Sequence, residues 1–334
     1  MTLDTVFRLA SVSKPIVSVA ALVLVAQGRL DLDQGIDAWL PDFRPGLLDG
    51  RPARITARQL LSHTAGLGYR FLEADAGGPY AQAGVSDGMD ASGIGLDENL
   101  RRLASTALLY EPGTGWGYSL ATDVLGALIE RITDTSLDQA VRDLVTGPLG
   151  MNDTGFVARD PERVATAYVN DTPQPHPLAE GETVSPFDGA VGIAYSPDRI
   201  FDTQAFPSGG AGMAGTAGDF LRFLEALRMP NGVLLPQEII KEMGKDQTGG
   251  RELQDAPGLG FGLGFSVLRD PQLAVSPEST GTWRWGGAYG HSWFVDHTQG
   301  LSVVAFTNTM YEGMSGRFVN EVRDAVYGEA QVPA

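Results

Sequence analysis

The order of the expected elements predicts an α+β fold, formed by a single domain over residues 1–334 that is large enough to hold an active site. Helical patterns occupy most of the chain, and three apolar runs joined by tight turns come near its end. Strands joined by tight turns pair antiparallel, so these runs predict an antiparallel meander flanked by helices. We expect a mainly helical and loop subdomain over 15–210. An α/β subdomain is expected over 211–334 together with 1–14.

The helices are predicted from apolar periodicity and from capping residues. The first begins near Ser11, is apolar almost all the way round and has Gly28 as its C-cap. A long segment over 68–95, rich in Gly, Asp and Ala, is expected to be a surface loop that covers a cleft. The predicted helices span 11–28, 56–63, 97–109, 119–132, 137–145, 217–227, 236–243 and 316–327.

The predicted strands cover 260–268, 292–296 and 301–307, and the last two are joined across 297–300. The Gly-rich stretch 283–290 is expected to be an approach to the second of these strands. Two adjacent glycines there would let the backbone pass close to a ligand.

Composition excludes several classes of protein. The net charge of −17 argues against a nucleic-acid partner, because no basic patch faces phosphates. The chain has no cysteine, which excludes thiol catalysis and Cys-ligated zinc. Its longest apolar run, 16–26, is too short to span a membrane. With ten residues before Ser11 and no signal peptide among them, a cytoplasmic location is expected.

The first candidate for chemistry is the pair Ser11 and Lys14. Residues i and i+3 share one face of a helix, so the hydroxyl and the amine should lie side by side. Burial pushes a lysine toward its neutral, proton-accepting form, which is how an amine activates a serine nucleophile. The plainer interpretation is a helix N-cap followed by a first-turn lysine.

Two later stretches could join this pair. Tyr118 stands at a turn-to-helix junction, and a phenol near a lysine can act as a base. Gly286 and Gly287 could point backbone N–H groups at an oxyanion. Taken singly, these residues fit equally well as a core tyrosine and a strand bulge.

Ser11-Val-Ser-Lys14, Tyr118-Ser-Leu120 and Trp285-Gly286-Gly287 together closely resemble the motifs of the serine β-lactamase-like superfamily. That superfamily includes class C β-lactamases, D-Ala-D-Ala peptidases and family VIII carboxylesterases. The resemblance implies a β-lactamase/transpeptidase-like fold and acyl transfer through Ser11, with Lys14 and Tyr118 as its base. It also implies an oxyanion hole from the N–H groups of Ser11 and Ala288, and no metal or cofactor. Supporting stretches are 55–67, 111–114, 148–154 and 208–213.

Departures from the lactamase motifs favour an esterase. Lactamases carry Tyr-x-Asn and Lys-Thr-Gly, whereas this chain has Leu120 and Trp285 where the Asn and the Lys would stand. The resemblance implies that these changes replace an amide and a cation with apolar surface, as in family VIII, so we expect a short-chain, uncharged ester as the small-molecule substrate. The expected substrate-binding residues are Trp285, Gly286, Gly287, Leu120, Tyr289, Trp116 and His291.

Alternatives remain from the sequence. A β-lactamase or D-amino-acid peptidase is one, and a non-catalytic ligand-binding relative is another. His63, in a helix-ending turn, is expected to be structural. Relatives carry several dozen residues before the nucleophile that form a helix and the first strands, so we expect N-terminal strands to be missing and the sheet to have an open edge. Such an edge could be covered by a second copy in a homo-oligomer.

Overall fold

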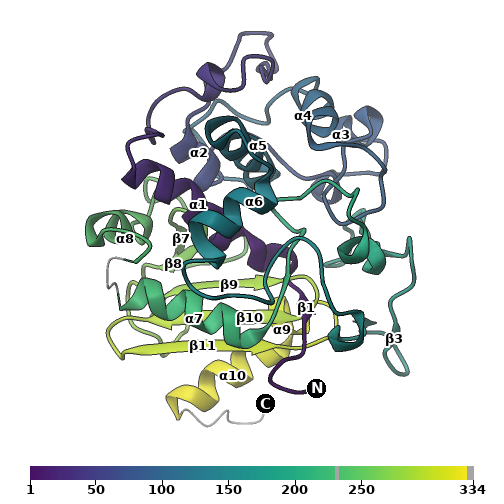
Figure 1. Cartoon of the computed structure of the whole chain (residues 1–334), viewed down its shortest axis with the longest axis vertical. Helices are drawn as coiled ribbons and strands as arrows, with labels where there is room; N and C mark the ends of the chain where they lie inside the picture. The colour runs from purple at the N-terminus through teal and green to yellow at the C-terminus, as the bar shows by residue number, and fades with distance from the viewer. Residues whose placement is uncertain (230–232, 329–334) are drawn as a thin grey trace.

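The computed structural model describes residues 1–229 and 233–328, and it contains a five-stranded antiparallel sheet below a helical region (Figure 1). The sheet runs in the order β11-β10-β9-β8-β7, so its strands are neighbours in sequence order. The α+β prediction is confirmed. The strands are β7 (Leu259–Phe261), β8 (Ser266–Leu268), β9 (Trp283–Gly287), β10 (His291–Asp296) and β11 (Leu301–Phe306).

The sheet has two more strands than the sequence indicated. The single strand predicted over 260–268 is a hairpin, because the chain reverses at Gly264. Its φ of 112° is readily adopted by glycine and rarely by other residues. The Gly-rich approach over 283–290 contains β9, which pairs with both β8 and β10. The turn over 297–300 joins β10 to β11 as predicted.

Each of the eight predicted helices has a counterpart in the structure, with different lengths, whereas the short helices over 79–83 and 312–315 were not predicted. The fifth predicted helix, 137–145, begins as an α-helix and continues as a π-helix over Arg142–Thr146. The α-helices are α1 (Ser13–Ala26), α2 (Ala57–Leu61), α3 (Pro79–Ala83), α4 (Leu96–Ala104), α5 (Ala121–Thr133), α6 (Leu137–Val141), α7 (Ala217–Arg228), α8 (Gln237–Met243), α9 (Glu312–Ser315) and α10 (Arg317–Tyr327).

The expectation of a surface loop over 68–95 was only partly right. The segment holds a 3-10 helix, η3 (Arg70–Leu72), and the short α3. Val85 and Ser86 are almost completely buried, so this part of the segment belongs to the interior. The segment is partly buried because apolar and hydrogen-bonding side chains are interspersed among its Gly and Asp residues.

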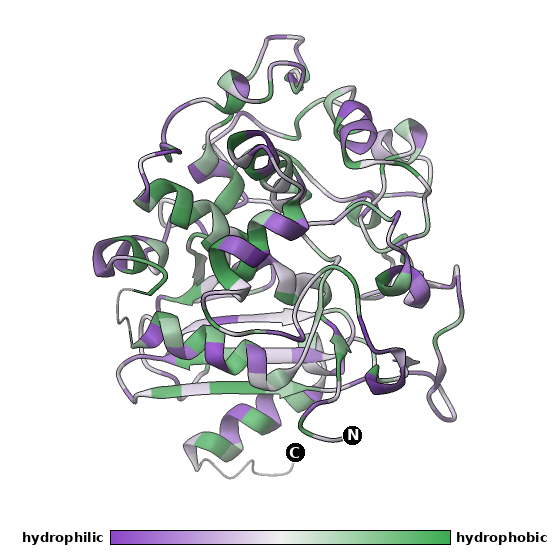
Figure 2. Ribbon diagram, viewed as in Figure 1, coloured by the Kyte–Doolittle hydropathy of each residue, from purple (hydrophilic) through white to green (hydrophobic). Residues whose placement is uncertain are grey.

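Helix α1 lies at the centre of the helical region. Every residue from Ser13 to Leu24 is buried, as expected for a helix that is apolar on all sides. It packs against α5 and α6 (Figure 1), and Figure 2 shows its predominantly hydrophobic colouring. Lys14 is the single charged residue in this helix.

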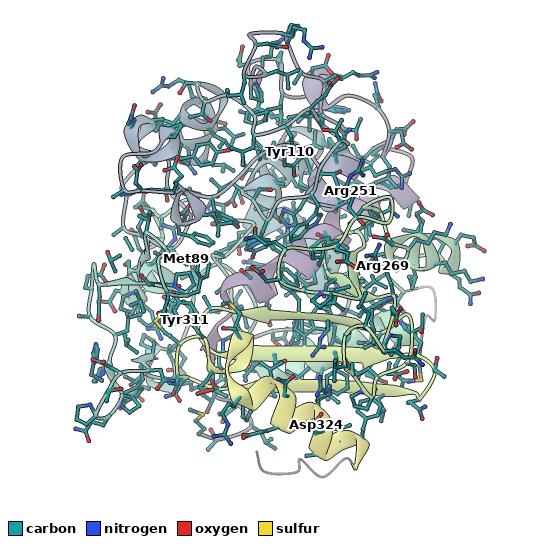
Figure 3. All side chains as sticks on the ribbon, turned by 180° about the vertical axis from the view of Figure 1, so that it is seen from behind. Met89, Tyr110, Arg251, Arg269, Tyr311 and Asp324 are labelled. Atoms are coloured by element: carbon teal, nitrogen blue, oxygen red, sulfur yellow. The ribbon has the colours of Figure 1, made fainter. Side chains whose placement is uncertain are left out.

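Helices cover both faces of the sheet. Helix α7 packs on β11 from one face, and α9 contacts β9 and β10, with α10 beside it, on the other face (Figures 1 and 3). None of the helices within 1–229 and 233–328 is both long and apolar enough to cross a lipid bilayer.

A two-stranded sheet joins the start of the chain to its second half. β1 (Phe7–Arg8) pairs with β6 (Ala214–Gly215). Two further hairpins pair β2 (Tyr168–Val169) with β3 (His176–Pro177) and β4 (Thr183–Val184) with β5 (Ile193–Ala194). The β1–β6 pairing brings the residues after β1 to the end of β9, where the helical region meets the sheet.

Candidate active site

Ser11 lies at the sharp turn between β1 and α1. Ala10 has a φ of 44°, a left-handed value that residues with a Cβ seldom adopt. The turn continues as the 3-10 helix η1 (Ala10–Val12) into α1. Ala10 and Val12 are buried while Ser11 keeps part of its surface exposed. The turn therefore presents one hydroxyl from an otherwise buried segment.

The Lys14 amine reaches this hydroxyl, as the i, i+3 spacing indicated. Lys14 is completely buried, and its Nζ lies 3.2 Å from Ser11 Oγ. Nζ also donates to the Gly210 carbonyl at 2.8 Å. No carboxylate within 1–229 and 233–328 forms an ion pair with it, so the amine is held by neutral oxygens near the hydroxyl.

Tyr118 completes the group. Its hydroxyl shares a 2.5 Å hydrogen bond with Ser11 Oγ, and Lys14 Nζ lies 4.5 Å from the centre of its ring. The Ser11 hydroxyl thus contacts both the Lys14 amine, three residues away, and the Tyr118 hydroxyl, 107 residues away. A hydroxyl between a phenol and an amine can pass its proton to them while it attacks an electrophile.

His63 helps to hold Tyr118. The Gly117 N–H donates to the His63 carbonyl at 3.0 Å, and His63 Nδ1 hydrogen-bonds Ser119 Oγ at 3.0 Å. The imidazole lies 5.1 Å from the Tyr118 ring. Burial, together with the nearby Lys14 charge, lowers the pKa of His63 well below its usual value. These contacts are structural, as the sequence indicated, and fix the residues on both sides of Tyr118.

The end of β9 supplies the second candidate oxyanion donor. A Cβ on Gly287 would collide with the Leu9 carbonyl, so the strand approaches η1 closely. The Ala288 carbonyl accepts from the Tyr311 N–H at 2.8 Å. Across the described part of the chain, neither the Ser11 nor the Ala288 N–H has a hydrogen-bond acceptor. The Ser11 N–H and the Ala288 N–H, which follows the close approach of β9 to η1, are thus two free donors of the kind that an oxyanion hole requires.

Tyr311 connects this corner to the interior segment at 85–89. Its hydroxyl hydrogen-bonds the Tyr195 hydroxyl at 3.0 Å, and the Ser196 N–H donates to the Met89 carbonyl at 2.8 Å. Figure 3 shows Tyr311 and Met89 on the same side of the molecule. This network fixes the loop that follows β9.

An aromatic wall borders Tyr118. We use this name for a series of rings in pairwise contact, with centroids 4.7–5.7 Å apart. Trp116 and Trp285 are only partly buried, whereas Phe261 between them is completely buried. The members, in order of contact, are Trp116, Phe261, Trp285, Tyr118, Tyr69 and Phe71. The wall offers apolar surface for an acyl or alcohol group.

The structure places Trp116 and Trp285 in this wall, with Gly286 and Gly287 in the adjoining strand, but three other expected pocket residues lie in the interior. Leu120 is completely buried within the core, because the first residues of α5 turn inward. Tyr289 is 6% exposed and packs against Tyr195.

His291 is a clearer correction. It is 0% exposed, and its Nε2 hydrogen-bonds the Arg8 carbonyl at 2.8 Å. Its ring packs between Phe7 and Phe306, and burial lowers its pKa to about 4. The β1 strand covers this side of β10, so His291 does not line a substrate pocket here.

The polar groups that surround the Lys14 amine were not predicted from the sequence. Asp123 accepts from Ser208 Oγ at 2.6 Å, and Gly210 supplies the carbonyl that holds the amine. Burial raises the pKa of Asp123, opposed by the Ser208 hydrogen bond and the Lys14 charge. Burial also raises the pKa of Tyr69 well above its usual value. The stretch 208–213 supported the family resemblance, but no role in the site was predicted for it. No local sequence pattern marks Asp123 or Tyr69 as site residues.

Within the described residues, no cluster of three or more His, Asp or Glu side chains is arranged to hold a metal ion. The chemistry assembled here consists of a hydroxyl, an amine, a phenol and two backbone N–H groups. These are the parts required for acyl transfer through a serine.

Comparisons with known proteins show which chains this one is similar to. The family model described as Beta-lactamase matches residues 1–327. Esterase EstB of Burkholderia gladioli is 51% identical over 325 residues, which cover 97% of this chain and 82% of the esterase. The solved structure of EstCE1, a hydrolase with promiscuous acyltransferase activity, superposes with a TM-score of 0.95 at 46% identity, covering 98% of this chain and 86% of that one. Lovastatin esterase of Penicillium rubens is 28% identical over 328 residues, covering 90% of this chain and 78% of that enzyme.

Proposed function

The chain belongs to the Beta-lactamase family, and we propose that it is a serine carboxylesterase of that family, cleaving short-chain, uncharged esters through an acyl-enzyme on Ser11. The observation that carries this proposal is the contact of one hydroxyl with two candidate bases. Ser11 Oγ shares a 2.5 Å hydrogen bond with Tyr118 and lies 3.2 Å from Lys14 Nζ. The similarity to Esterase EstB supports the same reaction.

In acylation, the Ser11 proton passes to the Tyr118–Lys14 pair while Oγ bonds to the ester carbonyl carbon. The carbonyl π electrons move to its oxygen, which the Ser11 and Ala288 N–H groups bind. Removal of one such donor typically costs about 2.7–4 kcal/mol of barrier lowering. When the intermediate collapses, the C–O bond to the alcohol breaks, and the leaving oxygen takes the proton from the pair.

In deacylation, the same pair takes a proton from water while the water oxygen attacks the acyl-enzyme carbonyl. The second tetrahedral intermediate collapses, the bond to Ser11 Oγ breaks, and the proton returns to Oγ. A carboxylic acid leaves. Each half-reaction therefore uses the pair once as base and once as acid.

The residues around Ser11 favour an ester over an anionic β-lactam. Trp285 places an indole 5.3 Å from the Tyr118 ring, where it adds apolar surface. Leu120 has no side-chain amide and is completely buried, so this position offers a substrate no hydrogen-bonding group. The wall thus suits an uncharged acyl or alcohol group.

The test is hydrolysis of a chromogenic short-chain ester by the wild type and by Ser11→Ala, with a chromogenic cephalosporin assayed in parallel. Ester turnover that disappears in the variant supports the proposal. Turnover of the cephalosporin alone would make the protein a β-lactamase. Acylation of Ser11 without turnover, or no acylation, would make it a non-catalytic ligand-binding relative.

A second candidate function is acyl transfer from an ester to an alcohol, favoured by the aromatic wall and by the similarity to EstCE1. An aryl alcohol bound against Trp285 could replace water in deacylation. In the presence of benzyl alcohol, appearance of the benzyl ester with a matching fall in free acid supports this activity. Formation of acid alone contradicts it.

A further inference from the structure

A cluster of buried polar groups surrounds the Lys14 amine. Asp123 and Ser208 are at most 1% exposed. A Cβ placed on Gly210 would lie 2.6 Å from Asp123 Oδ2, 3.2 Å from the Tyr69 hydroxyl and 3.5 Å from Lys14 Nζ. A carboxylate, a phenol and an amine therefore converge on one point, and the position has room only for glycine.

One oxygen of the Asp123 carboxylate, Oδ2, faces this point, where the Gly210 backbone also approaches it. Its Oδ1 accepts from Ser208 Oγ at 2.6 Å, whereas Oδ2 has no hydrogen-bond partner among the residues described. Buried polar atoms without a partner are uncommon and cost free energy, so the structure must gain elsewhere. Burial raises the pKa of Asp123, whereas the nearby Lys14 and Arg199 charges act in the opposite direction and favour the carboxylate.

We propose that Asp123 is a positioning residue for Lys14. Its carboxylate faces the amine across Gly210 and stabilises the ammonium that forms when the Tyr118–Lys14 pair takes the Ser11 proton. The role is comparable to that of a carboxylate that supports a catalytic base without touching substrate. This inference rests on the proposed role of Ser11 as nucleophile.

Several other ionisable groups face this cluster from the elements around it. Lys14 comes from α1, and His63 faces it from the turn after α2. Tyr69 precedes η3, Asp87 comes from the interior segment, and Arg199 comes from the 3-10 helix over 197–201. Tyr118 faces it from the turn before α5. Among these groups, Asp123 combines a free carboxylate oxygen with a direct approach to the point shared with Lys14.

Asp123→Asn tests the proposal, because the amide oxygen can still accept from Ser208 while the charge is removed. Loss of a neighbouring negative charge lowers the pKa of an ammonium. We expect the acid limb of the kcat/KM profile against pH to move down by about one unit. We also expect kcat to fall roughly 10–100-fold with KM nearly unchanged. A loss of this size is typical when a residue that orients a metal-binding side chain is removed, and we expect a residue that orients a catalytic base to behave similarly.

The matched control is Asp219→Asn. Asp219 is also a buried carboxylate, but it accepts from the Asp153 N–H and pairs with Arg222 on α7. This variant should reduce thermal stability and leave the acid limb in place. Asp123→Glu should restore the wild-type limb, because it restores the charge.

The readout that separates this inference from the esterase proposal is the rate at which a fluorophosphonate labels Ser11, followed against pH. Labelling depends on the Ser11 proton and not on ester turnover. A wild type that labels but hydrolyses no ester would defeat the esterase proposal alone. An acid limb that stays in place in Asp123→Asn would overturn the positioning role, whatever happens to the rate. If Asp123→Asn does not fold, Asp123→Ser removes the same charge and carries the same expectation.

Discussion

The two sides of Ser11 differ in chemistry. One side is the aromatic wall, where Trp116 and Trp285 keep part of their surface exposed beside the buried Phe261. The other side is the buried polar cluster, where Lys14, Asp123 and Ser208 are almost completely enclosed. From this difference we expect a division of work, in which the partly exposed tryptophans of the wall bind substrate and the enclosed cluster handles the proton. Variants on the two sides should therefore change different kinetic constants.

The largest effect is expected at the residue between the two sides. Ser11→Ala removes the nucleophile, so ester hydrolysis should fall by about 10⁴-fold or more. Steady-state kinetics with a chromogenic ester measures this. The control is Ser18→Ala, another buried serine of α1, which should retain most activity. Activity that persists in Ser11→Ala would place the nucleophile elsewhere.

Tyr118→Phe should have the next largest effect. It keeps the ring contact with Trp285 and removes the hydroxyl that meets Ser11 Oγ. We expect kcat to fall roughly 10²–10⁴-fold with little change in KM, because a proton acceptor is lost and binding surface is kept. Unchanged hydrolysis would leave Lys14 as the sole base and contradict the assignment of Tyr118.

A buried carboxyl near the polar cluster, Asp87, should make the free energy of unfolding depend on pH. Burial raises the pKa of Asp87 to about 7, and its carboxylate accepts from the Arg70 N–H at 2.9 Å. The folded state therefore keeps this proton up to about pH 7, whereas the unfolded chain loses it near pH 4. The resulting stability is full below pH 4 and is lost as pH rises through 7.

We expect Asp87→Asn to remove this dependence. Between pH 5 and 8 the free energy of unfolding of the wild type should fall by about 2–3 kcal/mol relative to that of the variant. Urea unfolding at the two pH values measures the difference. Asp143→Asn, at an exposed carboxylate of the π-helix, is the control and should follow the wild type. Parallel pH dependence in Asp87→Asn would assign the proton to another group.

The smallest effect is expected on the aromatic wall. Trp285→Ala removes apolar surface beside Tyr118, so KM for an aryl ester should rise about 10-fold, with kcat changed less. Trp39→Ala, at a tryptophan that is 38% exposed and lies outside the aromatic wall, is the matched control. A fall in kcat without a change in KM would mean that Trp285 serves the proton-transfer side.

Local patterns were enough to place much of the fold. The helix predicted over 56–63 is present, and Thr56 and Gln59 form a capping box at its start. The turn over 297–300 was also recognisable, since it joins two apolar runs. The hairpin of β7 and β8 was not, because four apolar or glycine residues over 261–264 continue the strand pattern through the turn.

The site was predictable where spacing or motif carried the information. Ser11 and Lys14 are neighbours on one helical turn, so their contact follows from local geometry. His291 and Leu120 were assigned to the pocket because they stand beside motif residues. Their burial depends on tertiary partners, and His291 meets a carbonyl 283 residues away. Asp123 likewise lies near Lys14 only because of tertiary packing, so the sequence alone did not indicate their proximity.

The Gly210 carbonyl that holds Lys14 comes from 196 residues further along the chain, and Ala288 comes later still. During synthesis, Ser11 leaves the ribosome first but acquires its partners only after the sheet strands have emerged. The nascent chain should therefore be unreactive toward acylating agents until its fold closes. Reactivity of this one hydroxyl would then report completion of folding, with no need for an attached fluorophore.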